Sequence, residues 1–165
     1  MAIDFLALLE SLAETGLEFV IVGGVAARLH GSDRVTHDID VVPSLEAERW
    51  ARAVDALWAG GARPRIPEPR ERVRDVAWIE AWIRERGMIA LTFRSADGLF
   101  EIDILVGEST RFGELRERAI RVPFGRHTYL VASIDDLIAM KRELGRPQDL
   151  LDAETLESIK GRTTG

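Results

Sequence analysis

Apolar residues recur along this chain with two different periods, and these periods separate predicted helices from predicted strands. Apolar side chains at helical spacing over residues 3–15 predict an amphipathic helix that ends near Gly16. Residues 19–22 form a short apolar run that is typical of a buried strand, and a short helix is predicted over residues 25–30. Residues 38–42 alternate polar with apolar side chains, which predicts a second strand.

The middle of the chain contains two further helical patterns. Ser44 is predicted to cap a helix over residues 45–59, whose acidic first turn suits the helix dipole. The glycines and prolines that follow predict a loop with little regular structure, and a helix is then predicted over residues 73–86. Trp78 and Trp82 lie one turn apart in it, and we interpret them as core packing and not as a platform for base stacking.

The second half of the chain predicts a hairpin, a second strand pair and three helices. Strands over residues 88–93 and 99–106 meet around Asp97-Gly98, a hairpin signal. The other elements are predicted as strands over 120–123 and 127–131 and helices over 112–118, 133–144 and 147–160, the last two separated by Gly145 as a C-cap with Pro147 opening the second. Strands interleaved with helices indicate an α/β or α+β fold. With 165 residues, the chain is expected to be a single domain, residues 1–165.

Composition and charge narrow the class of protein. The chain has no cysteine and no run of eighteen apolar residues, and its first residues are acidic and not a basic leader. We therefore expect a cytoplasmic protein without a membrane partner. The net charge of −6 argues against a grip on long DNA. The arginines between Arg63 and Arg74 form either a small basic patch or, as the simpler alternative, a solvated irregular segment.

Three features together point to phosphate chemistry. Gly23 and Gly24 stand between a predicted strand and a predicted helix, where a backbone without side chains can approach a phosphate. Asp38 and Asp40 lie two residues apart on a strand and share one face, so a divalent cation would relieve their repulsion. Asp103, on a later strand, would complete a two-metal site and could accept a proton from an attacking hydroxyl group. The alternatives are a tight turn for the glycines and an exposed strand face for the two aspartates.

Glu101 shares the predicted strand face of Asp103 and is the other candidate for the third carboxylate. We prefer Asp103 because its shorter side chain holds a metal more rigidly.

In their order and spacing, these motifs resemble the DNA polymerase beta-like nucleotidyltransferase superfamily. Its signature is a hydrophobic strand, Gly-Gly or Gly-Ser, a short helix, Asp-hydrophobic-Asp, and a third acidic residue on a later strand. This chain has Val20 to Gly24, then Asp38-Ile39-Asp40, then Asp103. Residues 30–36 are similar to the bacterial branch that includes abortive-infection toxin-like nucleotidyltransferases, which commonly shows H-G before R-x-T-x-D-I-D. Residues 133–152 resemble the closing helices of that branch.

The resemblance covers about residues 19–156 and implies a fold. It implies a nucleotidyltransferase fold with a mixed central sheet flanked by helices and a C-terminal helical pair. The catalytic core would span about residues 17–131, and the closing helices would span about residues 133–160.

The resemblance also implies roles for individual residues. Gly23 and Gly24 would contact the triphosphate, Asp38 and Asp40 would bind both metals, and Asp103 would bind the catalytic one. The expected cofactor is Mg²⁺ as two ions, with Mn²⁺ as an alternative, and the nucleoside triphosphate is a co-substrate.

Three further residues have two possible roles each, and three more are expected to be structural. Lys141 would neutralise phosphate charge or lie on a solvated helix face, while Arg34 and Thr36 would line the mouth of the site or belong to a capped loop. Asp149 is expected to hold Lys141 or Arg146 and not to touch substrate. His30 and His37 are expected to be structural.

We expect an enzyme that moves a nucleoside monophosphate, AMP in the first place, from ATP or another nucleoside triphosphate to an acceptor hydroxyl and releases pyrophosphate. The acceptor is left open among a protein, an RNA end and a small molecule. The alternative is a toxin-like or scaffold protein of the same fold that acts through an antitoxin or other partner protein. A metal-dependent nuclease is a third hypothesis, which Gly23-Gly24 counts against because a nuclease needs no phosphate loop.

Overall fold

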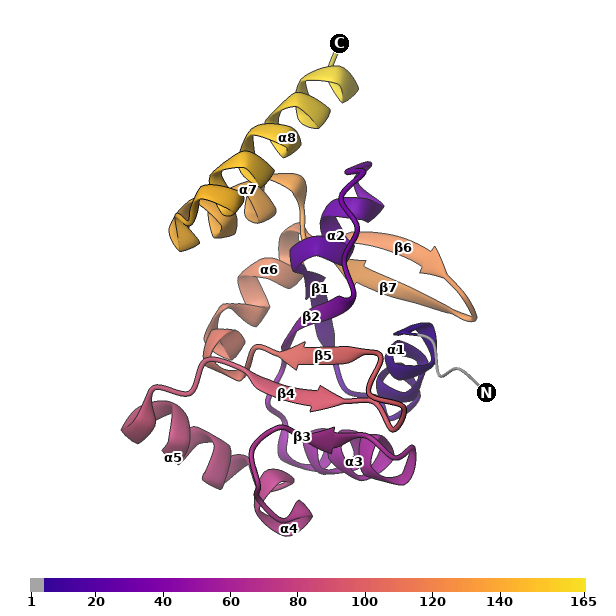
Figure 1. Ribbon diagram of the computed structural model, residues 1–165, viewed down its shortest axis with the longest axis vertical. Coiled ribbons are helices and arrows are strands. Elements are labelled where there is room, and N and C mark those ends of the chain that lie inside the picture. Colours follow the sequence, from indigo (N-terminus) through magenta and orange to yellow (C-terminus); the bar gives the residue numbers. More distant parts are fainter. Residues whose placement is uncertain (1–4) are drawn as a thin grey trace.

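Seven strands of this chain form one mixed sheet. The computed structural model describes residues 5–165, so the predicted start of the first helix at Ile3 and Asp4 lies outside the described residues. The strands are β1 (Phe19–Val22), β2 (Asp38–Pro43), β3 (Arg63–Pro64), β4 (Leu91–Arg94), β5 (Glu101–Ile104), β6 (Ile120–Phe124) and β7 (His127–Val131). Their order in the sheet is β3-β4-β5-β2-β1-β7-β6 (Figure 1). The expected α/β class with a mixed sheet is confirmed.

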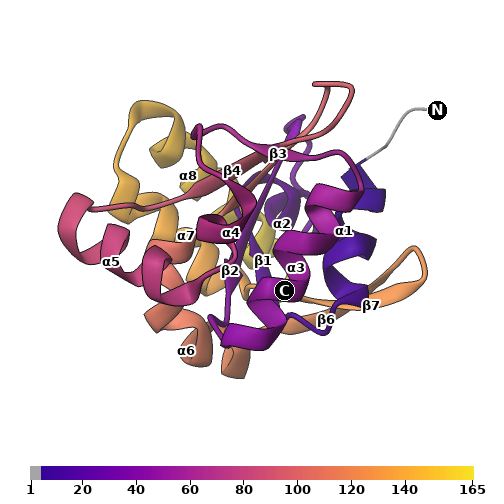
Figure 2. The same cartoon turned by 90° about the horizontal axis from the view of Figure 1, so that it is seen from below.

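Helices connect and flank these strands. Within residues 5–165 they are α1 (Phe5–Glu14), α2 (Gly23–Leu29), α3 (Ala47–Ala59), α4 (Arg70–Val73), α5 (Val76–Arg86), the 3-10 helix η1 (Val106–Arg111), α6 (Phe112–Arg118), α7 (Ile134–Leu144) and α8 (Pro147–Thr163). The helices α7 and α8 pack side by side at one end of the molecule, and α3 and α4 lie at the opposite end (Figure 1). Seen from below, α1 and α3 lie next to each other (Figure 2).

The register of the central strands determines which side chains share a face. β2 is antiparallel to β1 and parallel to β5, and β5 is antiparallel to β4. Asp40 is paired with Asp103, and Asp103 with Thr92. Paired residues of neighbouring strands project to the same side, and successive residues alternate. One row of side chains across three strands is therefore polar.

The opposite face of the same three strands forms part of the core. Its side chains are all at most 1% exposed and comprise Ile39, Val41, Leu91, Phe93, Ile102 and Ile104. They belong to one buried cluster with Leu9 and Leu12 of α1 and Trp50 and Leu57 of α3. This burial is the main stabilising contribution of the sheet, because each fully buried aliphatic side chain contributes roughly 1.5–3 kcal/mol relative to an exposed one.

Local sequence signals explain where several elements begin and end. Gly145 adopts the left-handed conformation (φ +67°) at the end of α7, and Pro147 occupies the first turn of α8, as predicted. Gly98 (φ +73°) lies in the connection between the antiparallel strands β4 and β5, so the predicted hairpin is confirmed.

Two boundary predictions in the middle of the chain are wrong. The cap of α3 is Glu46, whose carboxylate accepts from the backbone N–H groups of Glu48 and Arg49, whereas the N–H of Ser44 donates to the carbonyl of Glu18. The helix predicted over residues 73–86 begins three residues later, as α5, because Val73 is the last residue of α4. Asp75 separates them because its side chain caps α5 by accepting from the N–H of Ala77.

The segment predicted as an irregular loop, between α3 and α5, contains the short strand β3 and the helix α4. Trp78 and Trp82 stack on each other with ring centroids 4.6 Å apart, and both are half-buried. Trp78 packs against the core, as expected, while Arg86 lies over the Trp82 ring.

Across residues 5–165, no helix combines the length and the apolar character that a membrane crossing requires.

Candidate functional site

The site is built around two carboxyl groups on neighbouring strands. Asp40 of β2 and Asp103 of β5 are direct register partners, and their carboxyl groups are close enough to share a hydrogen bond. Asp38 lies two residues before Asp40 on the same face and is paired with Glu101. The topology thus brings the three predicted aspartates to one face of the sheet.

Burial and the charges of neighbouring carboxylates raise the pKa values of Asp40 and Asp38. Burial, followed by the negative charges of Asp103 and Asp38, raises the pKa of Asp40 to about 7. Lys141 acts in the opposite direction on Asp40. Burial and the charges of Asp103 and Glu101 also raise the pKa of Asp38. Two like charges in a partly dry site therefore make the ionised form of Asp40 costly.

Only glycine fits at position 23, because the backbone there lies against the side chain of Asp40. The φ of Gly23, +68°, lies in the left-handed region, and a Cβ atom placed on this residue would lie 2.2 Å from Oδ2 of Asp40. Gly24 likewise lies against Thr36, whose Cβ would be 3.0 Å from an added Cβ. Gly23 therefore lets the turn after β1 pass directly over the carboxylate of Asp40, and Gly24 lets it lie against Thr36.

Asp103 has a partner that sequence reasoning missed. The hydroxyl group of Thr92 on β4 donates to Oδ1 of Asp103 at 2.5 Å. The alternation of Leu91, Thr92 and Phe93 is the sequence signal, since it places a hydroxyl on the polar side of an otherwise apolar strand. Asp103 is thus held on one of its two oxygens.

Glu101, the other candidate for the third carboxylate, is already paired. Its Oε1 accepts from Nε of Arg94 at 3.0 Å and lies 3.5 Å from Nε of Arg65. The contrast with Asp103, which contacts a hydroxyl group and a second carboxyl group, supports the preference for Asp103.

The donor set fits a hard divalent cation in its chemistry, because every candidate ligand is a carboxylate oxygen. Within residues 5–165, however, no three His, Cys, Asp or Glu side chains are arranged to hold a metal ion. The pair Asp40–Asp103 is assembled, and Asp38 lies on the same face beside it.

A pocket of about 410 Å³ adjoins this pair. Gly23 and Gly24 line one edge of it, and its charged lining residues are Asp40, Glu108, Arg111, Lys141, Glu143 and Arg146. Its apolar wall is formed by Val22, Ile89, Leu105, Leu137, Met140 and Leu144. This volume is within the range of small-molecule sites.

The closing helices hold the cations of this pocket in an ion-pair network. Nζ of Lys141 lies 2.9 Å from Oδ2 of Asp152 and 3.5 Å from Oδ1 of Asp149, and Arg146 donates to Asp149 at 2.5 Å. The expectation that Asp149 holds Lys141 and Arg146 is confirmed, and Asp149 is 2% exposed. The role of Asp152 was not predicted from the sequence. Its side chain accepts a hydrogen bond from Nε2 of Gln148 on α8 and also pairs with Arg34.

The remaining predicted residues lie at the edge of the site. Arg34 reaches Lys141 only through Asp152, and it does not line the pocket. Thr36 donates to the backbone carbonyl of Asp38 at 3.2 Å. His30 is structural, as expected, since its Nε2 lies 2.8 Å from the carbonyl oxygen of Ala132. His37 is exposed.

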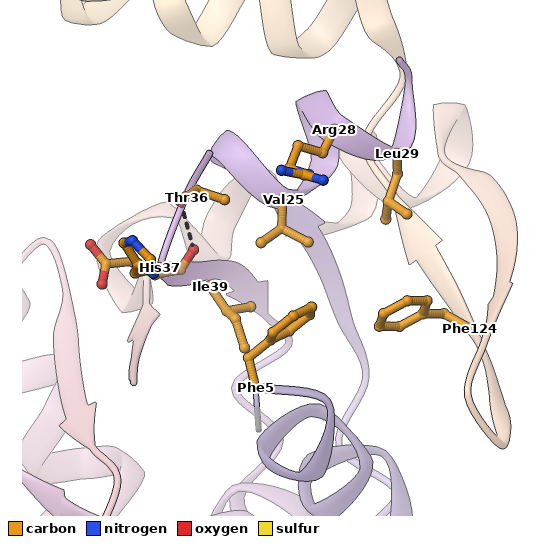
Figure 3. A pocket seen from close by; sticks show the side chains of 9 residues that line it. Phe5, Val25, Arg28, Leu29, Thr36, His37, Ile39 and Phe124 are labelled. Atoms are coloured by element: carbon orange, nitrogen blue, oxygen red, sulfur yellow. Dashed lines mark hydrogen bonds between the residues drawn. The ribbon is translucent and has the colours of Figure 1, made fainter. Parts of the chain in front are cut away.

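A second pocket of about 440 Å³ lies behind the acids (Figure 3). Phe5 and Phe124 stack at 5.9 Å on one side of it. The rest of the lining comprises Val25, Arg28, Leu29, Thr36, His37, Asp38 and Ile39. Ile39 projects to the opposite face of β2 from Asp40. This pocket therefore borders Asp38, but it lies across β2 from Asp40 and Asp103.

No protein-family model and no curated protein matches this chain.

Proposed function

We propose that this protein is a metal-dependent nucleotidyltransferase, which transfers a nucleoside monophosphate from ATP or another nucleoside triphosphate to an acceptor hydroxyl group. The observation that carries the proposal is the pair Asp40–Asp103, packed under Gly23 at the border of a pocket that also holds Lys141 and Arg146. An acidic pair beside cationic side chains suits a ligand that is itself a complex of metal and triphosphate.

Asp40 and Asp103, with Asp38 beside them, would hold Mg²⁺. When bound, the metal supplies charge neutralisation for the triphosphate and acidifies the attacking hydroxyl group. Its binding would also offset the repulsion that raises the pKa of Asp40.

The chain's own residues would divide the remaining work. Lys141 and Arg146 would bind phosphate oxygens, exchanging part of their pairing with Asp149 and Asp152 for the ligand. Thr92 would keep one oxygen of Asp103 engaged, so that the other oxygen faces the acceptor and takes its proton. The acceptor oxygen then bonds to the α-phosphorus, the bond to the β-phosphate breaks, and pyrophosphate leaves.

The test compares the wild type with Asp40→Asn in ATP binding and in pyrophosphate release with Mg²⁺, using a cell lysate as the acceptor source. Asp40→Asn should lower pyrophosphate release at least about a thousandfold, equivalent to about 4 kcal/mol of transition-state stabilisation. Asp135→Asn is the matched control, because Asp135 lies exposed on α7 and pairs with Lys160. It should leave release unchanged.

Two results would overturn the proposal. If the wild type binds no ATP and Asp40→Asn changes nothing, the partner-dependent scaffold is favoured. If nucleic-acid strands are cut without pyrophosphate release, the nuclease hypothesis is favoured. In a positive experiment, ATP labelled at the α-phosphate marks the acceptor for mass spectrometry.

A further inference from the structure

The arginines between Arg63 and Arg74 are not one basic patch. Arg70 and Arg74 pair with Asp55, and Arg72 pairs with Glu68. Arg63 donates to the carbonyls of Trp58 and Ala62 and lies over the Trp58 ring. Arg65 is the member of the group that contacts the polar face of the central strands.

Arg65 and Arg94 meet on this face beyond the acids. Arg94 is paired in register with Glu101, which is paired with Asp38. The backbone N–H of Arg65 donates to the carbonyl of Thr92, so β3 continues alongside β4 there. The polar face thus changes from carboxylates on β2 and β5 to guanidinium groups on β4 and β3.

Both guanidinium groups converge on a single oxygen. Oε1 of Glu101 lies 3.5 Å from Nε of Arg65 and 3.0 Å from Nη2 of Arg94. The Arg65 and Arg94 side chains remain 57% and 51% exposed, whereas that of Glu101 is 19% exposed. Two arginines therefore share one carboxylate, and both guanidinium groups remain open to solvent.

This arginine pair lies on the far side of the acids from the pocket with Lys141. Gly23 follows β1, Arg94 is on β4, and β2 and β5 lie between them. Neighbouring strands are about 4.8 Å apart, so the two cationic groups flank Asp40 and Asp103 from opposite sides. A triphosphate bound beside Gly23 leaves Arg65 and Arg94 without a role in holding it.

We propose that Arg65 and Arg94 bind a phosphate group of the acceptor, so that the acceptor is a phosphate ester whose free hydroxyl group lies at Asp103. This inference rests on the proposed function, because that function defines the reacting face. Paired guanidinium forks suit phosphate oxygens, and Arg94 is on the strand adjacent to Asp103. Arg94 and Thr92, which donates to Asp103, are two residues apart on β4, a rise of about 7 Å.

The experiment measures binding without ATP. The probe is a short fluorescein-labelled single-stranded RNA with a free 3′-hydroxyl, followed by fluorescence anisotropy across a salt series. The variants are Arg65→Gln, Arg94→Gln and their combination, with Arg72→Gln as the matched control from the same segment. Competition by ribose 5-phosphate, with ribose as its unphosphorylated control, shows whether a small ester or only an RNA end satisfies the site.

Each arginine removed should weaken binding by about fivefold, the upper end for an exposed ion pair, and reduce the salt slope by about one. Arg72→Gln should bind as the wild type does. Glu101→Gln should tighten binding, because it frees both guanidinium groups. If the arginines served only to neutralise Glu101, Glu101→Gln would leave binding unchanged.

Several results would overturn the inference: no binding of either phosphate ester by the wild type, equal losses in Arg72→Gln and the double variant, or competition by ribose as strong as by ribose 5-phosphate.

ATP binding, measured in the same variants, should be unchanged. Arginine-dependent ester binding without any ATP binding would retain this site and reject nucleotidyl transfer. ATP binding with pyrophosphate release, but without ester binding, would retain nucleotidyl transfer and reject this site. Urea unfolding of each variant shows that it is folded, and Glu101→Gln keeps the test available if the double variant is not.

Discussion

The two faces of the strands β2, β5 and β4 differ by one residue in register and are opposite in energetics. On one face, Ile39, Ile102 and Phe93 are almost completely buried. On the other, Asp40, Asp103 and Thr92 stand side by side, and burial raises the pKa of Asp40 to about 7. The same backbone ladder supports both. Burial on the apolar face therefore stabilises the sheet strongly enough to hold mutually repelling acids together on the other face.

The largest expected effect is the pH dependence of stability in Asp40→Asn. The pKa of Asp40 rises from 3.8 to about 7 on folding, so the folded protein holds this proton more tightly than the unfolded chain does. The wild type should therefore lose stability as the pH rises through this window, on the order of 4 kcal/mol in all, with no further loss from this group above about pH 8. Asparagine does not ionise, so the difference in unfolding free energy between the variant and the wild type should grow in favour of the variant by this amount as the pH rises.

Urea unfolding in EDTA at about pH 4 and about pH 8 measures this gap. Asp38→Asn should give a gap of the same sign and smaller size, because the pKa of Asp38 is also raised but its side chain is exposed. A gap that stays constant with pH would contradict the account of an electrostatically strained pair.

A somewhat smaller effect of opposite sign is expected on the apolar face. Ile102 is 0% exposed and lies next to Asp103 in sequence. Ile102→Ala should destabilise the protein by about 3 kcal/mol at any pH, since it removes buried methylene groups and leaves a cavity. Ile102→Val, which removes one methyl group, should cost about 1 kcal/mol. Losses that follow pH, as at Asp40, would show that the two faces are not energetically separate.

The turn between β1 and α2, which packs against Asp40, should respond less strongly. Gly23→Ala should cost about 2 kcal/mol, because alanine is strained at positive φ and its Cβ would meet the carboxylate of Asp40. Gly87→Ala is the control: Gly87 has φ +64° and nothing within 4 Å of an added Cβ. Its cost, about 1 kcal/mol, isolates the backbone strain. Equal losses in urea unfolding would show that Asp40 moves aside freely.

Much of this fold follows from local patterns in the sequence. The strand over residues 19–22 and the helix over residues 112–118 have their predicted bounds, because apolar periodicity and flanking glycine or arginine residues define both. The break between α4 and α5 was not predicted, because it depends on a hydrogen bond from the N–H of Ala77 to the side chain of Asp75. The short strand β3 depends on pairing with β4, which is a long-range contact.

The site shows the same division. Asp38 and Asp40 follow from their spacing on one strand, but the pairing of Asp40 with Asp103 depends on sheet order. Likewise, the sequence offers Asp149 as a partner of Lys141, whereas the closer partner, Asp152 at 2.9 Å, is identified only by the packing of the helices. Spacing in the sequence predicts which residues share a face, whereas strand order and helix packing determine which residues they pair with.

The smallest expected effect is at Thr92, where the polar face is supported by one hydroxyl group. Thr92→Val keeps the shape of the side chain and removes the donor to Asp103, which should cost about 1 kcal/mol of stability. Under the proposed function, pyrophosphate release should fall about tenfold, because Asp103 loses the contact that fixes one of its oxygens. Thr92→Ser retains the hydroxyl and should keep most of the transfer rate even where it loses stability. A rate that follows stability through both variants, instead of following the hydroxyl group, would show that Thr92 acts only in packing and does not position Asp103.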